Sequence, residues 1–156
     1  MAGENQFLAR VPADGWAAFL PPGIVNRVCD YFSYGANFLP VPASGVLQQD
    51  IQIQNDSNFV ILAGIATVTD AENSSFLVHP AWPLTVAMND TGAGRQLQNT
   101  PQPLGNLFST ETWKLWPQPK FIRAGATLST TIANLTATAR NVRISFVGVK
   151  VFGFAG

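Results

Sequence analysis

Hydrophobic and polar side chains alternate along residues 46–54. Leu47, Ile51 and Ile53 share one parity, and Gln48, Asp50, Gln52 and Gln54 share the other. An alternation with a period of two residues is typical of a strand that buries one face. Further strands are predicted over residues 24–32, 126–133 and 141–152. The pattern of hydrophobic and polar positions alone therefore predicts a β protein.

Residues 59–69 are apolar almost without interruption. Turn residues bound this run on both sides, and its second half is rich in β-branched residues, so we predict a central strand covered on both faces and bent at Gly64. The last predicted strand changes character along its length. It begins with polar alternation, with Val142, Ile144 and Phe146 on one face. Its end is apolar on both faces.

Prolines and glycines divide these strands. Residues 35–45 and 89–107 predict loops, the second of them long, and residues 55–58 and 70–75 predict turns. A strand over residues 82–88 follows Pro80 and contains Pro83, which favours the edge of a sheet. Residues 113–122 combine two tryptophans with two prolines.

Six to eight short strands with no long helix predict an all-β fold, namely an antiparallel β-sandwich or jelly roll. A closed barrel is the alternative. We assign residues 23–156 to a single β-sandwich domain and residues 1–22 to an extended N-terminal arm, because Pro12, Pro21 and Pro22 interrupt that segment. Its aromatic side chains predict an arm that packs either on its own domain or over a neighbouring subunit. These aromatic residues are Phe7, Trp16 and Phe19.

The charges are divided unevenly along a chain of zero net charge. Residues 112–156 contain six of the nine basic residues and no acid, whereas residues 1–111 contain all nine acids. Only 12% of the residues are charged, about half of the usual ~25%, which indicates a surface partly covered by partners or by copies of the chain. A nucleic-acid partner is not expected, because such binding needs an excess of basic residues.

Residue types that carry chemistry are scarce. The only cysteine is Cys29, so an intrachain disulfide is excluded. The only histidine is His79, and one histidine with one cysteine gives no basis for a metal site. We predict no cofactor, no catalytic site and no enzymatic activity. We expect no membrane partner, since no apolar run approaches ~18 residues, and no signal peptide.

Three tryptophans lie near Lys114 and Lys120 and permit two interpretations. As a stacking platform they would bind a glycan or a single-stranded nucleic acid. Aromatic side chains are also favoured in cores and at protein interfaces. The three tryptophans are Trp82, Trp113 and Trp116.

Residues 50–59, 116–128 and 141–152 give the chain a resemblance to small β-sandwich structural proteins of tailed-bacteriophage virions, especially capsid cement or decoration proteins. The resemblance covers most of the chain. It implies a non-enzymatic protein, made in the host cytoplasm, that binds the major capsid protein on the outside of the virion and contacts copies of itself as a dimer or trimer. A head–tail connector or tail protein and a carbohydrate-binding β-sandwich module are the alternatives.

Two groups of side chains are the expected contacts with such partners. The arm contributes Phe7, Trp16 and Phe19, and the basic part of the sheet contributes Arg123, Arg140 and Arg143. We interpret the uneven charge as a sign of self-association or of docking on an acidic protein shell. Assembly is then expected to weaken as ionic strength rises, because salt screens contacts between exposed charges.

Overall fold

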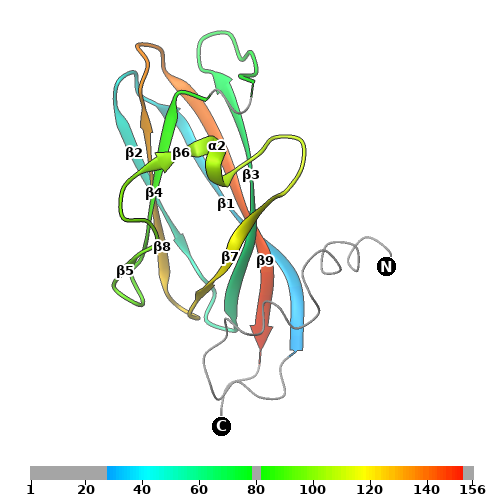
Figure 1. The fold of residues 1–156 in the computed structure, drawn as a ribbon. Helices are drawn as coiled ribbons and strands as arrows, with labels where there is room; N and C mark the ends of the chain where they lie inside the picture. The colour runs from blue at the N-terminus through cyan, green and yellow to red at the C-terminus, as the bar shows by residue number, and fades with distance from the viewer. Residues whose placement is uncertain (1–27, 79–81, 153–156) are drawn as a thin grey trace.

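A computed structural model of the chain describes residues 28–78 and 82–152. In these residues nine strands and one four-residue helix form an almost entirely β structure (Figure 1). The strands belong to two sheets, and every pairing between strands in them is antiparallel. The predicted all-β antiparallel class is therefore confirmed. The predicted arm lies outside the described residues.

The first sheet has the strand order β1-β9-β3-β7. Its strands are β1 (Val28–Val41), β9 (Arg140–Phe152), β3 (Asn58–Asp70) and β7 (Lys114–Ile122). β9 lies between β1 and β3 and pairs with both along most of its length. β1 and β7 are consequently the edge strands of this sheet.

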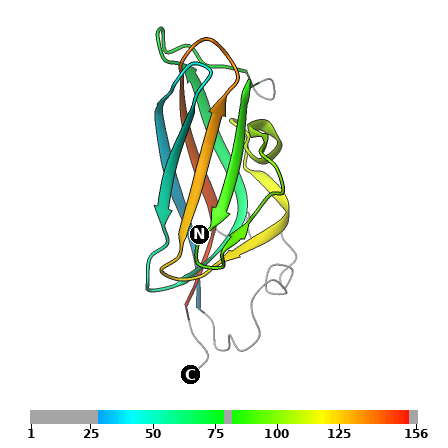
Figure 2. The same cartoon turned by 90° about the vertical axis from the view of Figure 1, so that its left-hand side faces the viewer.

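The second sheet has the order β2-β8-β4-β5, and the short strand β6 also pairs with β4. Its strands are β2 (Val46–Gln52), β8 (Thr127–Asn134), β4 (Leu84–Asp90), β5 (Arg95–Gln96) and β6 (Gln102–Pro103). Helix α2 (Leu104–Leu107) follows β6 and leads the chain back to β7. In Figure 2 the strands β2, β8 and β4 lie in front of the strands of the first sheet.

Side chains from both sheets form the main hydrophobic core. Phe59 and Phe146 from the first sheet and Leu128 and Ile132 from the second belong to it. Phe146 packs against Phe108 with ring centroids 5.6 Å apart, in the edge-on geometry that aromatic pairs prefer. The sequence builds this core by alternation, because every second residue of each strand points to it.

A second, smaller apolar cluster involves the same two central strands. Along β3, Phe59 and Ile61 belong to the main core, while Val60 and Leu62 belong to the second cluster. Since successive side chains of a strand point to opposite faces, the second cluster lies on the face away from the main core. The predicted covering on both faces is confirmed for residues 59–64, whereas from Ile65 to Thr69 only every second residue is buried. β3 is irregular between Ile61 and Ala63, next to the predicted bend.

The prediction of a loop over residues 35–45 is wrong for residues 35–41, which belong to β1, and correct for residues 42–45, which connect β1 to β2. Glycine, asparagine and proline in this segment suggested a loop. The alternation of its apolar residues decides the structure, since Ala36 and Phe38 are buried in the main core while Gly35 and Asn37 are exposed. The predicted strand over residues 24–32 is described only from Val28, where β1 begins.

Two further predictions are corrected around β4. The strand predicted over residues 82–88 does not lie at an edge, because β4 pairs with β8 on one side and with β5 and β6 on the other. These two-residue strands and α2 lie within residues 89–107, which were predicted to be one long loop. Residues 113–122 mostly form β7, and its prolines Pro117 and Pro119 are tolerated because β7 is an edge strand.

Candidate protein interface

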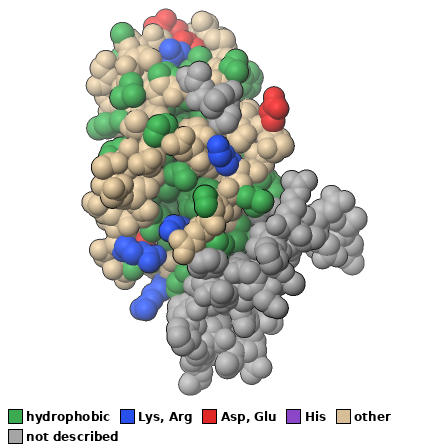
Figure 3. Space-filling view, in the orientation of Figure 1, with side chains coloured by type: hydrophobic (Ala, Val, Ile, Leu, Met, Phe, Trp, Pro, Cys, Tyr) green, Lys and Arg blue, Asp and Glu red, His purple; other side chains and the backbone are tan. Residues whose placement is uncertain are grey.

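Four large apolar side chains at one end of the molecule are highly exposed to solvent. The exposed fractions are 62% for Val46, 73% for Phe76, 80% for Val78 and 67% for Leu135. Val46 begins β2, and the other three belong to the connections β3–β4 and β8–β9, which lie together with the β1–β2 turn at the upper end in Figure 1. Figure 3 shows hydrophobic side chains on the surface there. We call these four residues the apolar end.

The β8–β9 turn, which carries Leu135, is held by one buried side chain. The amide of Asn134 donates a hydrogen bond to the carbonyl of Thr138 at 2.7 Å. Its side-chain oxygen accepts from the backbone N–H of Thr136 at 3.0 Å and from the hydroxyl of Thr136 at 2.8 Å. Ser44 of the β1–β2 turn also donates its N–H to the carbonyl of Thr136, at 2.7 Å. The two turns are therefore fixed to each other.

The β3–β4 connection, which carries Phe76 and Val78, is held at two points. Asp70 accepts hydrogen bonds from the backbone N–H groups of Glu72 and Asn73, at 2.8 and 3.3 Å. The indole N–H of the buried Trp82 donates to the carbonyl of Leu77 at 3.0 Å. The exposed side chains on either side of Leu77 thus project from an anchored backbone, which lowers the entropy lost on binding a partner.

The contacts of Asp70 make the stability of this end depend on pH. The N–H of Glu72 is the main cause that lowers the pKa of Asp70, with smaller contributions from the N–H of Asn73 and the nearby guanidinium of Arg140, while desolvation opposes them. A lowered pKa in the folded state gives stability that is present above the unfolded value of about 3.9 and is lost as pH falls through the folded value. We therefore expect the free energy of unfolding to fall more steeply below about pH 4 in the wild-type protein than in Asp70→Asn. Urea midpoints measured between neutral and strongly acidic pH test this, and parallel curves for the two proteins would contradict it.

Part of the uneven charge distribution is neutralised inside the chain. Arg140 at the start of β9 forms an ion pair with Asp70 at the end of β3, at 2.7 Å. Lys150 lies 3.4 Å from Asp56 and also bonds the amide oxygen of Gln54. β9 carries basic residues beside the acids of the earlier part of the chain because it pairs with β3. The charge split is thus in part a consequence of the strand order.

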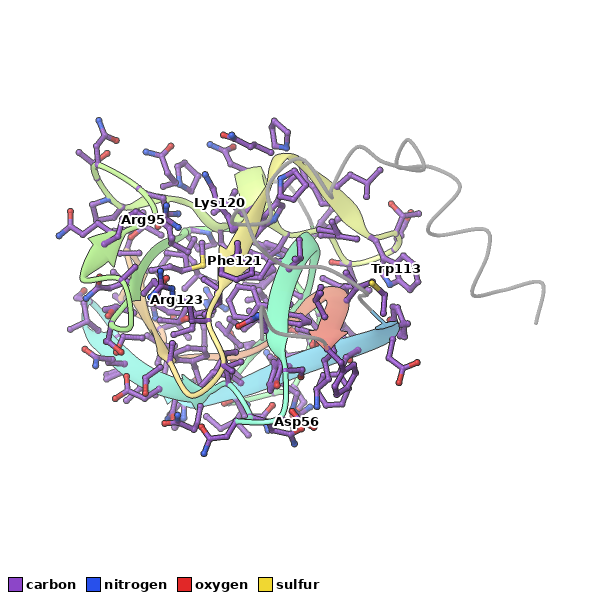
Figure 4. All side chains as sticks on the ribbon, turned by 90° about the horizontal axis from the view of Figure 1, so that it is seen from below. Asp56, Arg95, Trp113, Lys120, Phe121 and Arg123 are labelled. Carbon is purple, nitrogen blue, oxygen red and sulfur yellow. The ribbon has the colours of Figure 1, made fainter. Side chains whose placement is uncertain are left out.

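The structure separates the six predicted contact residues. Phe7, Trp16 and Phe19 lie outside the described residues. The three arginines do not form one group: Arg123 is exposed in the β7–β8 turn, Arg143 is exposed on β9, and Arg140 is held in its ion pair. Seen from below in Figure 4, Arg123 lies on the same side of the molecule as Arg95 and Lys120.

The three tryptophans do not form a stacking platform. Trp82 and Trp116 are buried in the main core, with exposed fractions of only 4% and 7%. Trp113 is partly exposed and stacks on Tyr31 with ring centroids 5.7 Å apart. The interpretation of these rings as core and interface residues is therefore correct for Trp82 and Trp116, and the predicted glycan site is not assembled from them.

The described residues contain few other features that carry chemistry. No group of three or more histidine, cysteine or acidic side chains in them is placed to hold a metal ion. Cys29 is exposed on β1, and His79 lies outside the described part of the chain. A shallow cavity of about 380 Å³ over the second sheet is lined mainly by amide and hydroxyl side chains. No helix in residues 28–78 and 82–152 is long and apolar enough to cross a membrane.

The apolar end was not predicted, although a signal for it exists. Phe76, Leu77 and Val78 follow directly on the predicted turn at residues 70–75 and precede Pro80, so three apolar residues stand between two turn signals. Only the structure shows that Leu77 points inward to the core while its two neighbours are exposed. Compared with known proteins, the chain matches no family model and no curated protein.

Proposed function

We propose that this protein is a virion structural protein that binds the outside of a phage capsid and stabilises it through contacts that bridge subunits. The observation that carries the proposal is the apolar end, where four exposed apolar side chains project from loops fixed by hydrogen bonds. Exposed apolar groups on an anchored framework are typical of a surface that binds another protein. The major capsid protein is the partner that we propose for this surface.

The order of the strands supports the proposal. We propose a jelly roll, in which eight strands numbered along the chain form sheets of order 1-8-3-6 and 2-7-4-5. When β5 and β6 are counted as one interrupted strand, β1-β9-β3-β7 and β2-β8-β4-β5 follow this scheme. The jelly roll occurs in viral capsid domains and also in lectins, so it favours a virion protein without excluding other binding proteins.

Such a protein would strengthen a shell without catalysis. A ligand that binds the assembled state of the shell, and not its disrupted state, stabilises that state by an amount that grows with the logarithm of one plus the ratio of free ligand concentration to dissociation constant. Many copies with modest affinity would therefore add up over the surface of a capsid. The scarcity of charge, at 12% of residues, is consistent with a surface largely covered by neighbours.

The double variant Phe76→Asp/Leu135→Asp tests the proposed contact. Burying two such side chains is worth about 1.5–3 kcal/mol each, so the charged variant is expected to bind at least about tenfold more weakly. Co-sedimentation with capsids stripped of the native protein measures the affinity, and heat release of the packaged genome measures the reinforcement. Leu115→Asp is the matched control, because Leu115 is also exposed but lies on β7, away from the apolar end.

Two results would count against the proposal. One is equal binding by the double variant and the control, and the other is equal heat resistance of capsids with and without the wild-type protein. Electron microscopy of particles carrying the labelled protein distinguishes the positions in the virion. Label over the whole shell supports a decoration protein, whereas label only at the tail vertex would replace it by a connector.

A further inference from the structure

The edge strand β1 lacks the features that usually prevent edge strands from pairing. Residues 31–39 contain no charged residue and no proline, although natural edge strands are commonly blocked by lysines, prolines or bulges. β9 is the only sheet partner of β1 within the described residues. The register shift of β1 comes only after Phe38, at the end of the strand. No described residue pairs with the outer side of residues 32–39, so this edge can accept a further strand.

Gly35 lies at the middle of this edge, and the fold of one chain gives no reason for a glycine there. Its backbone is not in the left-handed region. A Cβ atom at this position would come no closer than 3.5 Å to the carbonyl oxygen of Ile144 and 3.8 Å to the hydroxyl of Ser145, which are ordinary contacts. A glycine inside a strand often marks a place where another backbone approaches closely. Ser33, Gly35 and Asn37 are all exposed, so such an approach is open.

We propose that two copies of this chain pair antiparallel through β1, around a two-fold axis at Gly35. In this register the numbers of paired residues add up to 70. Large residues then face large ones at both ends of the paired segment, Tyr31 facing Leu39 of the second copy and Phe32 facing Phe38. Near the axis, Ser33 faces Asn37 and Tyr34 faces Ala36. The pairing would cover Tyr31 and Leu39, which are 41% and 46% exposed in the single chain.

A second copy fits this edge better than an unrelated strand does, because the segment is complementary to itself. Symmetric pairing places the same patch on both partners, as a closed dimer requires. The absence of charge means that the two copies meet without like-charge repulsion. Nine paired residues would form about eight to ten backbone hydrogen bonds, a number typical of a whole protein interface.

The dimer goes beyond the proposed binding to capsids and uses a different surface. It would join two four-stranded sheets into one continuous sheet of eight strands, with the two copies of β1 at its centre. The apolar end is made by turns and by Val46 on β2, so β1 pairing does not use its residues. The pairing is tested with the protein alone, and its failure would leave capsid binding untouched.

Cysteine cross-linking tests the register. In a Cys29→Ser background, Gly35→Cys places two thiols opposite each other with Cα atoms about 4.5–5.5 Å apart, within the range that a disulfide spans. We expect a disulfide-linked dimer under mild oxidation. Asn37→Cys is the matched control: its two copies would lie four residues apart along the strands, about 13 Å, and should not cross-link. Mixing Asn37→Cys with Ser33→Cys should restore the cross-link.

A charge at the axis tests the association itself. Gly35→Lys places two lysines directly opposite each other across the axis. Like charges in this position destabilise a sheet, so we expect the dimer to weaken by up to about fivefold in sedimentation equilibrium. Gln118→Lys, an exposed residue on β7 at the other edge of the same sheet, should leave the dimer unchanged. A wild-type protein that stays monomeric up to about 1 mM, or cross-linking by Asn37→Cys as efficient as by Gly35→Cys, would overturn the proposal.

Discussion

Replacement of Gly148 by alanine is expected to leave the protein without a stable fold. Gly148 lies in β9, opposite Ile61 of β3 and Phe32 of β1. An added Cβ atom would overlap the backbone carbonyl of Val60 and would come within 3.2 Å of the Cα atom of Ile61. Because the obstacle is backbone, no change of side-chain rotamer can relieve it.

The size of the effect follows from the position of β3. This strand is paired on both sides, with β9 and with β7, so it cannot move away from an added methyl group without breaking one of the two ladders. We expect a loss of more than about 4 kcal/mol, which is a large part of the ~5–15 kcal/mol that stabilises an ordinary domain. Urea unfolding monitored by fluorescence and by circular dichroism measures the loss.

Gly35→Ala is the matched control for this experiment. Both glycines lie in strands of the same sheet, but a Cβ atom at Gly35 meets nothing closer than 3.5 Å. Since glycine is entropically costly in a strand, this variant should change the stability of the monomer by less than about 1 kcal/mol and in the favourable direction. A Gly148→Ala protein within 1 kcal/mol of the wild type would show that β9 and β3 pack less tightly than the structure indicates.

Periodicity predicted the strands of the centre of the fold well. β2, β3, β8 and β9 begin or end within two residues of the predicted ranges. The apolar character of β3 and of the end of β9 on both faces also indicated two apolar environments, and the structure contains two clusters there. These features depend on local alternation, which a sequence displays directly.

The wrong predictions arose where glycine, asparagine or proline indicated a loop or a sheet edge and the alternation of apolar residues indicated a strand. Residues 35–41 contain glycine, asparagine and proline, yet Ala36 and Phe38 continue the inward parity set by Tyr34. Burial of these side chains in the main core outweighs the weak strand propensity of their neighbours. For Pro83 the error is of another kind: it lies one residue before β4, where no ladder hydrogen bond is needed.

The candidate site was harder to predict, because it depends on contacts between distant segments. Arg140 and Asp70 are seventy residues apart in the chain, and only the pairing of β9 with β3 brings them together. Ser44 and Thr136 are also far apart in the chain, and the pairing of β2 with β8 brings together the two turns that contain them. Tryptophan content likewise could not distinguish Trp116, which packs on Phe146, from the exposed ring of Trp113.

Asn134→Ala is expected to cost about 1–3 kcal/mol, because the partly buried N–H of Thr136 loses its hydrogen bond and the carbonyl of Thr138 loses one of its two. Asn134 is only 3% exposed, and its side chain satisfies the carbonyl of Thr138 together with the N–H and hydroxyl of Thr136. A polar group that is left unsatisfied inside the protein costs about 1–3 kcal/mol. The hydroxyl of Thr136 also donates to the carbonyl of Thr138 at 3.1 Å, so these two groups keep a partner and the N–H of Thr136 carries most of the loss. Thermal and urea unfolding measure the loss.

Asn73→Ala separates the effect of burial from that of the turn itself. The side-chain oxygen of Asn73 accepts from the N–H and the hydroxyl of Ser75, at 3.0 and 2.6 Å, which is the same pair of bonds that Asn134 makes to Thr136. Asn73 is exposed, so water replaces its bonds and the expected loss is below about 1 kcal/mol. Similar losses in the two variants would contradict the role assigned to the buried amide.

The same variant links the fold to the proposed function. Leu135 follows Asn134 directly, and release of the turn lets its side chain leave the apolar end, although no contact residue is altered. Asn134→Ala should therefore bind capsids more weakly, and faster hydrogen exchange at the N–H of Thr136 should accompany the loss. Undiminished capsid binding together with fast exchange at Thr136 would mean that the apolar end does not need a fixed backbone, and that its affinity comes from exposed apolar area alone.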